Sequence, residues 1–380
     1  MYRIGIVAGE ASGDVLGADL IQALRARAPG LKIEGIGGPL MEQQGCISLF
    51  RTEQLSVMGL VEVIGRYREL INIRNSVLEH FLGNPPDVFI GIDAPDFNLD
   101  LEVKLHGNNI RTVHYVSPKV WAWREYRVRK IKKAVDRMLV LFPFEKTYYE
   151  GHKIPVTYVG HPAADRIKLV PDRNGARARL GLPADRKIIA LMPGSRPMEL
   201  DRLLSIFLYA ADKCASARND VYFITSLLNE TSVERFKQAL INCSLEDLPV
   251  SVYHNRSDDV LEAADVALLA SGTVTLEAML YKLPMVVAYK MNPLSFYLIN
   301  AMVKIKYAAL PNLLAGVEVV PELLQGKCRP ESLAEYLLRW LDDNDAAEKL
   351  KSKFSLIHKQ LKQNTSSVAA KSIIGMLESP

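Results

Sequence analysis

Short β-branched and apolar runs alternate with helical patterns along the whole chain, and this alternation constrains the fold more than any other feature of the sequence. Several of the runs are apolar at nearly every position, which is typical of parallel strands buried on both faces. We expect strands at Arg3–Ala8, Lys32–Gly35, Val88–Ile92, Thr112–Val116, Met138–Phe142, Ile188–Met192, Val221–Thr225, Val250–Tyr253, Val266–Leu269 and Met285–Tyr289. Strand–helix alternation of this kind predicts an α/β fold with doubly wound sheets.

The alternation is interrupted once, between residues 160 and 186, where prolines and charged side chains accumulate without a clear strand. The sequence therefore predicts two Rossmann-like domains, residues 1–165 and 166–330, that face each other across a cleft. Ligands of such sheets bind at the carboxyl ends of the strands, so two facing sheets would hold two substrates. A helical tail at 331–380 is expected to pack back on the body. The tail could return to the first domain or reach a second copy of the chain, so a homodimer is one expectation.

Composition argues against several classes of protein. The chain has 380 residues, of which 49% are hydrophobic and 24% charged, and its formal net charge is only +4. These values are ordinary for a globular protein and do not indicate a nucleic-acid partner. The four cysteines form no Cys-x-x-Cys pair, which argues against structural zinc and disulfides and favours a reducing cytosol. The chain starts directly with a strand pattern, and no apolar run reaches the roughly 18 residues of a spanning helix, so we expect neither export nor a membrane span.

A first candidate anion-binding loop follows the expected strand Ile188–Met192 in the second half. Gly194 would let the backbone approach a ligand closely, and Ser195 could donate a hydrogen bond. Arg196 supplies a planar cationic fork that suits a phosphate. The alternative is an ordinary strand–helix turn with a surface arginine.

A second candidate loop, Ser271, Gly272 and Thr273, follows the expected strand Val266–Leu269 of this half and opens a helix. Backbone N–H groups at a helix start favour an anion, so the two loops together predict a nucleotide diphosphate. Glu277 lies one turn further on and could hold the two hydroxyls of a ribose, and Asn312 could help to close the site. The alternative makes the hydroxyl residues simple N-caps and Glu277 a surface charge.

The first half carries a carboxylate at a strand end. Asp93 follows the buried strand Val88–Ile92, where a doubly wound fold places catalytic groups and where a carboxylate is partly withdrawn from water. It is therefore a candidate general base that takes the proton of an attacking hydroxyl. Asp96, three residues further on, is a candidate acceptor contact. A helix N-cap is the alternative for Asp93 and more so for Asp96.

The first strand leads into a loop with Gly9, Glu10 and Ser12. The loop is rich in glycine but is not G-x-G-x-x-G, and its two carboxylates, Glu10 and Asp14, would repel a pyrophosphate. We therefore expect it to contact sugar hydroxyls or the other domain, and we expect no nicotinamide cofactor.

Two further segments suggest a lipid-like acceptor. Ser117, Trp121 and Trp123 follow the fourth strand, and the tryptophans could form a platform for a sugar or an acyl chain, although core packing is equally expected. A basic stretch from Arg124 to Arg137 comes next. It is either a solvated helix face or a patch for a phosphorylated acceptor or anionic headgroups.

An amphipathic helix is expected at Val57–Ile71. Such a stripe usually packs into a core, but the arginines around it also allow it to lie in a membrane interface. The candidate membrane contacts are Val57, Met58, Leu60, Val61 and Ile64.

A metal site is not expected. The only Asp-x-Asp occurs at Asp343-Asn344-Asp345, far from any expected strand end, and no His and carboxylate cluster has ligand spacing. His161 lies at the expected hinge, where it could either touch the cleft or be structural.

Six segments of the chain together resemble the lipid-A-disaccharide synthase family. They are Val7–Asp14, Gly91–Asn98, His114–Trp123, Leu191–Arg196, Ala270–Thr273 and Leu310–Gly316. The resemblance runs almost end to end. It implies a GT-B fold and an inverting transfer from UDP-2,3-diacylglucosamine to 2,3-diacylglucosamine 1-phosphate (lipid X), without a cofactor, giving the β-1,6-linked disaccharide 1-phosphate and UDP. It also implies a cytoplasmic enzyme peripherally associated with the inner membrane of a Gram-negative bacterium.

Carried over by motif, Asp93 is the expected catalytic base and Arg196 a diphosphate contact. Glu10, Ser12 and Asn312 are expected to lie in the cleft, Glu10 as a second catalytic residue. The main alternative function is a UDP-sugar 2-epimerase or hydrolase, which would need no acceptor. A peptidoglycan-type glycosyltransferase and a non-enzymatic lipid-binding protein are further alternatives.

Overall fold

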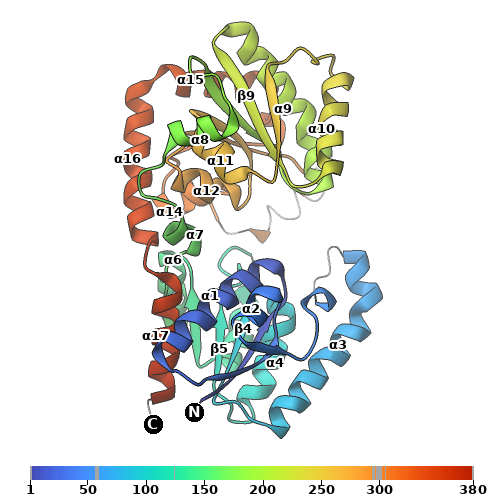
Figure 1. Ribbon diagram of the computed structural model, residues 1–380, viewed down its shortest axis with the longest axis vertical. Helices are drawn as coiled ribbons and strands as arrows, with labels where there is room; N and C mark the ends of the chain where they lie inside the picture. Colours follow the sequence, from blue (N-terminus) through green and yellow to red (C-terminus); the bar gives the residue numbers. More distant parts are fainter. Residues whose placement is uncertain are drawn as a thin grey trace. The chain divides into compact units, whose positions relative to one another are not determined.

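The computed structural model describes residues 2–55, 60–123, 125–292, 296, 302, 303 and 305–378, with backbone alone at residues 53 and 60–67. The chain divides into two compact units (Figure 1). Unit 1 contains Met1–Asp165 and Leu361–Pro380, and unit 2 contains Arg166–Gln360.

Unit 1 is built on a parallel sheet with the strand order β3-β2-β1-β4-β5-β6-β7. The strands are β1 (Arg3–Ala8), β2 (Lys32–Ile36), β3 (Cys46–Ser48), β4 (Val88–Ile92), β5 (Thr112–Tyr115), β6 (Arg137–Val140) and β7 (Val156–Tyr158). The helices are α1 (Ala11–Arg27), α2 (Pro39–Gln43), α3 (Leu60–Gly83), α4 (Pro95–His106), α5 (Val128–Ala134), α6 (Pro143–Gly151), α7 (Pro162–Arg166), whose last residue already belongs to unit 2, and α17 (Thr365–Glu378).

Alternation along β1 directs its side chains into two different apolar cores. Ile4 and Ile6 face a core shared with α1 and α17, whereas Val7 faces a second core with α3 and α4. Because successive side chains of a strand point to opposite faces, both faces must be covered by helices. Helix α17, from the end of the chain, lies beside α1 near the start (Figure 1) and buries Ala369 and Ile373.

Unit 2 repeats the same winding with the order β10-β9-β8-β11-β12-β13, again all parallel. Its strands are β8 (Lys187–Met192), β9 (Val221–Leu227), β10 (Val250–His254), β11 (Val266–Ala270), β12 (Met285–Tyr289) and β13 (Glu322–Leu324). Its helices include α8 (Arg173–Leu180), α9 (Pro197–Ala217), α10 (Glu230–Asn242), α11 (Ser257–Ala263), α12 (Val274–Leu280), α14 (Leu310–Ala315), α15 (Pro330–Asp342) and α16 (Asn344–Leu361).

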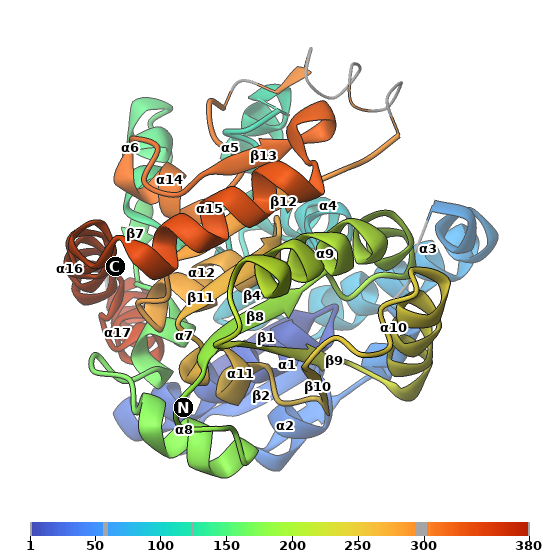
Figure 2. The same cartoon turned by 90° about the horizontal axis from the view of Figure 1, so that it is seen from above.

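Helices α9, α10 and α15 cover one face of this sheet and share its apolar core, with Phe207, Phe236 and Leu337 among the buried side chains (Figure 2). Helices α8 and α11 lie on the other side of β9 (Figure 1). This winding is the expected consequence of right-handed crossovers in a doubly wound sheet.

The prediction of an α/β fold with two Rossmann-like sheets is confirmed. The three strands that the sequence did not indicate, β3, β7 and β13, are the shortest and lie at sheet edges, where few residues carry a pattern. Strand β5 ends one residue earlier than expected because Val116 has a φ of 79° and leaves the extended conformation. The tail is shared, since residues 331–360 belong to unit 2 and 361–380 to unit 1.

Candidate functional site

The strand order brings the candidate residues of each unit to one edge of its sheet. In unit 1, β1 and β4 are neighbours, so the loops with Glu10 and Asp93 leave the sheet side by side. In unit 2, β8 and β11 are neighbours, so the loops with Arg196 and Thr273 do the same. In each unit these are the carboxyl ends of parallel strands, where open α/β sheets bind their ligands.

The turn after β4 has an unusual backbone. Asp93 and Ala94 both have positive φ, at 50° and 43°, and Pro95 then starts α4. Left-handed backbone costs a residue with a side chain about 1 kcal/mol or more, and such strain gathers at functional sites. The N–H of Asp93 donates to the carbonyl of Tyr115 at 2.9 Å, while its half-buried carboxylate makes no hydrogen bond or ion pair with any described residue. The Asp93 carboxylate is therefore available to a ligand.

The loop after β1 packs closely on that turn. A Cβ at Gly9 would lie 2.6 Å from the Cβ of Ala94, so only glycine allows this approach. Glu10 and Ser12 are exposed at the start of α1. Asp14 has a structural role instead, because its carboxylate accepts the N–H groups of Gly38 and Met41, both at 3.0 Å, at the start of α2.

Several residues of the predicted basic patch pair with acidic residues of α4. Arg127 bonds the exposed Asp96, and Lys130 and Arg74 bond Asp100. Arg127 and Lys130 of the patch are therefore partly neutralised, whereas Arg74 comes from α3, outside the patch. Arg129, Lys132 and Lys133 are exposed on the same segment, and Arg124 lies outside the described residues.

The predicted platform after β5 is held by a carboxyl that the sequence did not reveal. Glu145 is buried and accepts hydrogen bonds from the indole of Trp121 at 3.2 Å and from the N–H groups of Leu141 and Phe142. Burial raises the pKa of Glu145 to about 7, although the hydrogen bonds act in the opposite direction. Ser117 is also buried and bonds the hydroxyl of Tyr149 at 2.9 Å. The Ser117 hydroxyl is thus committed to the fold, and Trp121 is only half-buried.

Aromatic rings line up beside this platform. Trp121 meets Phe144 edge-on at 4.8 Å, Phe144 stacks on Phe142 at 5.7 Å, and Phe142 stacks on His161 at 5.4 Å between ring centroids. Burial lowers the pKa of His161 to about 4, so the imidazole is neutral near neutral pH. Trp123 is 41% exposed, outside this row.

In unit 2 the loop after β8 combines a glycine with a helix start. Gly194 has a φ of 114°, which L-residues avoid, and α9 begins at Pro197. The side chain of Arg196 is 82% exposed and lies 3.3 Å from the Glu199 carboxylate. Glu199 also accepts the N–H groups of Ser195 and Arg196 at 3.3 and 3.4 Å, a weak capping interaction that the sequence pattern did not indicate. An anion at this loop would have to share or replace that carboxylate.

The loop after β11 is more open. Gly272 and Thr273 are exposed, and no atom lies within 4 Å of a Cβ built at Gly272. Ser271 donates from its N–H to the carbonyl of Ala288 at 2.9 Å, as a continuation of the sheet. Glu277, one turn into α12, is half-buried, and burial together with the charge of Asp258 raises its pKa, while Arg166 lowers it. These groups can bind a polar ligand, with the backbone of the loop facing solvent.

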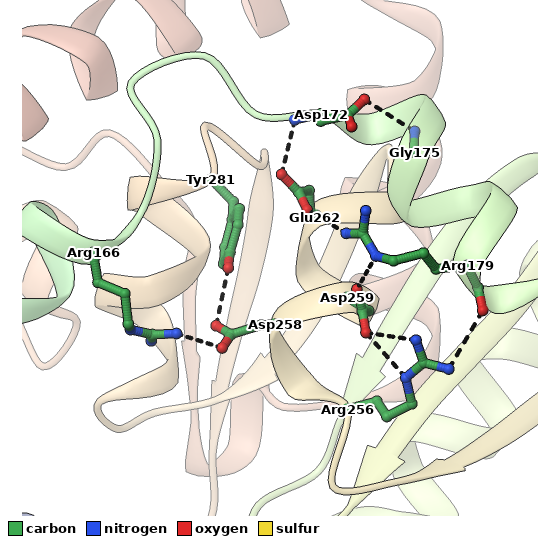
Figure 3. Close-up of polar contacts among 9 residues, drawn as sticks. All are labelled: Arg166, Asp172, Gly175, Arg179, Arg256, Asp258, Asp259, Glu262 and Tyr281. Carbon is green, nitrogen blue, oxygen red and sulfur yellow. Dashed lines mark hydrogen bonds and ion pairs between the residues drawn. The ribbon is translucent and has the colours of Figure 1, made fainter.

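A polar network attaches the first segment of unit 2 to α11 (Figure 3). Two of its members, Asp258 and Arg166, shift the pKa of Glu277 in opposite directions. Arg166 pairs with Asp258, which also accepts the hydroxyl of Tyr281 at 2.9 Å. Further along, Arg179 bridges Asp259 at 2.7 Å and Glu262 at 2.8 Å, and Arg256 bonds Asp259 at 2.8 Å. The network therefore fixes residues 166–180 on the helix beside α12.

Asn312 has its hydrogen-bonding groups occupied by the protein. It is fully buried, donates to the carbonyl of Val320 at 2.9 Å and to Glu322 at 2.7 Å, and accepts the N–H groups of Val319 and Val320. Glu322 in turn accepts the N–H groups of Ala308 and Ala309. The Asn312 side chain thus organises the segment whose Ala308 carbonyl lies 3.5 Å from the Ser271 hydroxyl.

The predicted membrane contacts are largely outside the described part of the protein. Val57 and Met58 lie outside the described residues, and Leu60, Val61 and Ile64 are described by their backbone in α3 alone. Within the described ranges, no helix is long and apolar enough to cross a membrane. In the same ranges, no group of three or more His, Cys, Asp or Glu side chains could hold a metal ion.

The sequence is similar to known proteins along nearly its whole length. The sequence model of the lipid-A-disaccharide synthetase family matches residues 4–374. The chain is 48% identical over 376 residues to lipid-A-disaccharide synthase of Pseudomonas aeruginosa strain UCBPP-PA14, covering 99% of this chain and 98% of that protein.

Solved structures share the fold at low sequence identity. A glycosyltransferase from Rickettsia africae has a TM-score of 0.61 and 14% identity, with 100% of this chain and 99% of that chain covered. UDP-GlcNAc 2-epimerase from Neisseria meningitidis, bound to UDP-GlcNAc, has a TM-score of 0.62 and 12% identity, with 99% of both chains covered. The two-sheet architecture is thus the GT-B type.

Proposed function

Because the chain belongs to the lipid-A-disaccharide synthase family and is a glycosyltransferase of lipid A biosynthesis, we propose that it transfers diacylglucosamine from UDP-2,3-diacylglucosamine to 2,3-diacylglucosamine 1-phosphate. The products are the β-1,6-linked disaccharide 1-phosphate and UDP. The match over residues 4–374 carries this proposal, because it spans both units and every candidate loop.

The proposed chemistry is a single inverting displacement. Asp93 accepts the proton of the acceptor 6-hydroxyl while that oxygen bonds to C1 of the donor sugar. The bond from C1 to the diphosphate oxygen breaks, and UDP leaves with the electron pair. Two observations support Asp93 in this role. Its carboxylate is available at a strand end, and its strained backbone is held by a hydrogen bond. Glu10 and Ser12, exposed on the loop that packs on this turn, are proposed to contact the acceptor.

We propose that unit 2 binds the donor. The diphosphate would contact Arg196 and the N–H groups of the loops at Gly194 and Gly272, at the starts of α9 and α12. An exposed guanidinium supports this assignment, because it can reorient from Glu199 to a phosphate. Glu277 would accept the ribose hydroxyls. Fixed dipoles and arginine would stabilise the leaving group without a metal ion.

The decisive experiment incubates the purified protein with the UDP-diacylglucosamine donor, with and without lipid X. We expect disaccharide and UDP only when both substrates are present. Release of UDP from the donor alone, with no disaccharide in the complete mixture, would instead support the epimerase or hydrolase alternative. Donor that stays intact in both mixtures would support a binding protein.

We also propose that the protein associates peripherally with the inner membrane. Tyr126 is 72% exposed and Trp123 41% exposed, next to the exposed basic residues of α5, and this combination suits an anionic interface. Replacing Val57, Met58 and Leu60 with serine should reduce cosedimentation with vesicles that contain phosphatidylglycerol.

The matched control replaces two exposed apolar residues of unit 2, Leu169 and Val170, with serine. This control should bind vesicles as the parent does. If the first variant also binds as the parent does, the 57–64 segment is not a membrane contact.

A further inference from the structure

Asn98 lies beneath the strained turn that carries Asp93. It is on the first turn of α4 and its side chain is completely buried. The two N–H bonds of the side-chain amide are shared among three carbonyl oxygens, those of Asp93 at 2.8 Å, Ile92 at 3.3 Å and Val7 at 3.3 Å. One amide group therefore connects the end of β1, the end of β4 and the turn.

The chemistry of these partners fixes the orientation of the amide. Three carbonyl oxygens can only accept, so a donor must face them, and a flipped amide would bring a fourth oxygen against the same group. The other end of the amide, Oδ1, is buried without a hydrogen-bond partner among the described residues. A buried oxygen without a partner is unfavourable, so the stabilisation must come from the donor end.

The backbone of the turn needs such support. Asp93 and Ala94 both adopt left-handed conformations that favour glycine. The N–H of Asp93 is held by Tyr115 of β5, and its carbonyl is held by Asn98, so the peptide groups on both sides of its Cα are fixed. The direction of the Cα–Cβ bond follows from that fixed backbone.

We propose that Asn98 is a positioning residue that holds the Asp93 carboxylate in its reactive orientation. This inference rests on the proposed role of Asp93 as the base. Asn98 does not touch substrate; it acts through the backbone of the turn.

The experiment measures kcat, the KM for donor and the melting temperature of Asn98→Ala. We expect kcat to fall roughly 10- to 100-fold, because misplacing a reacting group by about an ångström costs that much. The KM for donor and the Kd for UDP should stay within about twofold of the parent, because both report on unit 2. Asn108→Ala is the matched control, since that asparagine also donates to a backbone carbonyl, of Lys104 at 2.8 Å, but is exposed at the other end of α4.

A second variant separates positioning from general packing. Adding Ala94→Gly to Asn98→Ala should restore kcat at least about threefold, because glycine adopts the left-handed turn without the side-chain penalty. Loss of α4 packing alone would not be repaired at residue 94. If Asn98→Ala does not fold, Asn98→Ser, which keeps a donor, replaces it with the same measurements.

The proposal is overturned if the folded Asn98 variant keeps the parent kcat or if Ala94→Gly gives no recovery. Asp93→Asn measured in parallel distinguishes the two proposals. If it is inactive while the Asn98 variant is fully active, only the positioning role fails; if it is active, the role of Asp93 as base fails.

Discussion

The two units share one strand order over six strands, with β7 added in unit 1, but they differ at the edge of the sheet where ligands are expected. In unit 1 this edge consists of turns that the protein holds tightly: left-handed residues after β4 and β5, and buried polar side chains beneath them. In unit 2 the edge consists of loops with exposed glycine, threonine and arginine. A group that must move a proton needs a fixed direction, whereas a group that holds a charged ligand can adapt when the ligand arrives.

The largest expected effect comes from replacing Asp93, the fixed carboxylate of unit 1. Asp93→Asn should lower kcat about a thousandfold, because the amide cannot accept the acceptor proton, and should leave UDP affinity unchanged. Kinetics and calorimetric titration with UDP measure the two effects. Asp100→Asn is the control, because Asp100 is a carboxylate of the following helix α4 that pairs with Arg74. A kcat within tenfold of the parent for Asp93→Asn would remove Asp93 from the mechanism.

The same comparison predicts the opposite pattern for Arg196. Arg196→Ala should raise the Kd for UDP roughly 10- to 100-fold, the usual contribution of a charge-assisted hydrogen bond to phosphate. Arg196→Lys should recover only part of it, because lysine lacks the planar fork. Arg235→Ala, which removes an exposed arginine paired with Asp201, should leave the Kd unchanged. Unaltered UDP binding in Arg196→Ala would contradict the donor assignment.

Glu145 tests how tightly unit 1 is packed, because burial of its carboxyl makes the free energy of unfolding depend on pH. Its folded pKa of about 7 is above the ordinary value of 4.5. Below about pH 4.5 the carboxyl is protonated in both states. As the pH rises toward 7 the unfolded chain loses the proton first, so stability that was present at low pH is lost.

The free energy of unfolding of the parent, relative to Glu145→Gln, should therefore fall by about 2 kcal/mol between about pH 5 and pH 8. Denaturant titrations at several pH values measure this difference. Glu79→Gln removes an exposed carboxylate and serves as the control. A difference that stays constant with pH would mean that Glu145 ionises as freely in the folded protein as in the unfolded chain.

The smallest expected effects are changes in stability when a glycine at each of the two edges is replaced by alanine. Gly9→Ala should destabilise the protein by about 1 kcal/mol and slow turnover, because the new methyl meets Ala94 at 2.6 Å. Gly272→Ala should change stability by less than about 0.5 kcal/mol, because nothing lies within 4 Å of its Cβ and its φ is not positive. Thermal melts compare the two. Equal losses would show that the edge of unit 2 is as tightly packed as that of unit 1.

The sequence predicted what depends on local pattern. An apolar strand followed by Asp93 indicates a strand-end carboxylate, and a glycine and arginine after β8 indicate an anion loop. The scaffolding of these groups depends on contacts distant in sequence. Glu145 reaches Trp121 from the next strand–helix connection, and Glu322 reaches Asn312 from an edge strand of three residues. Asn312 illustrates the limit, because a polar residue in a recognisable motif gives no indication of whether its amide faces a ligand or the protein.

The return of α17 to unit 1 has a consequence for how the protein is made. Unit 2 is continuous in sequence, whereas unit 1 needs both ends of the chain, with Ala369 and Ile373 buried beside Ile4 and Ile6. During synthesis from the N-terminus, domains generally fold as they emerge. Residues 166–360 can therefore complete their fold before α17 is synthesised, whereas the sheet built from residues 1–165 stays partly uncovered until α17 leaves the ribosome.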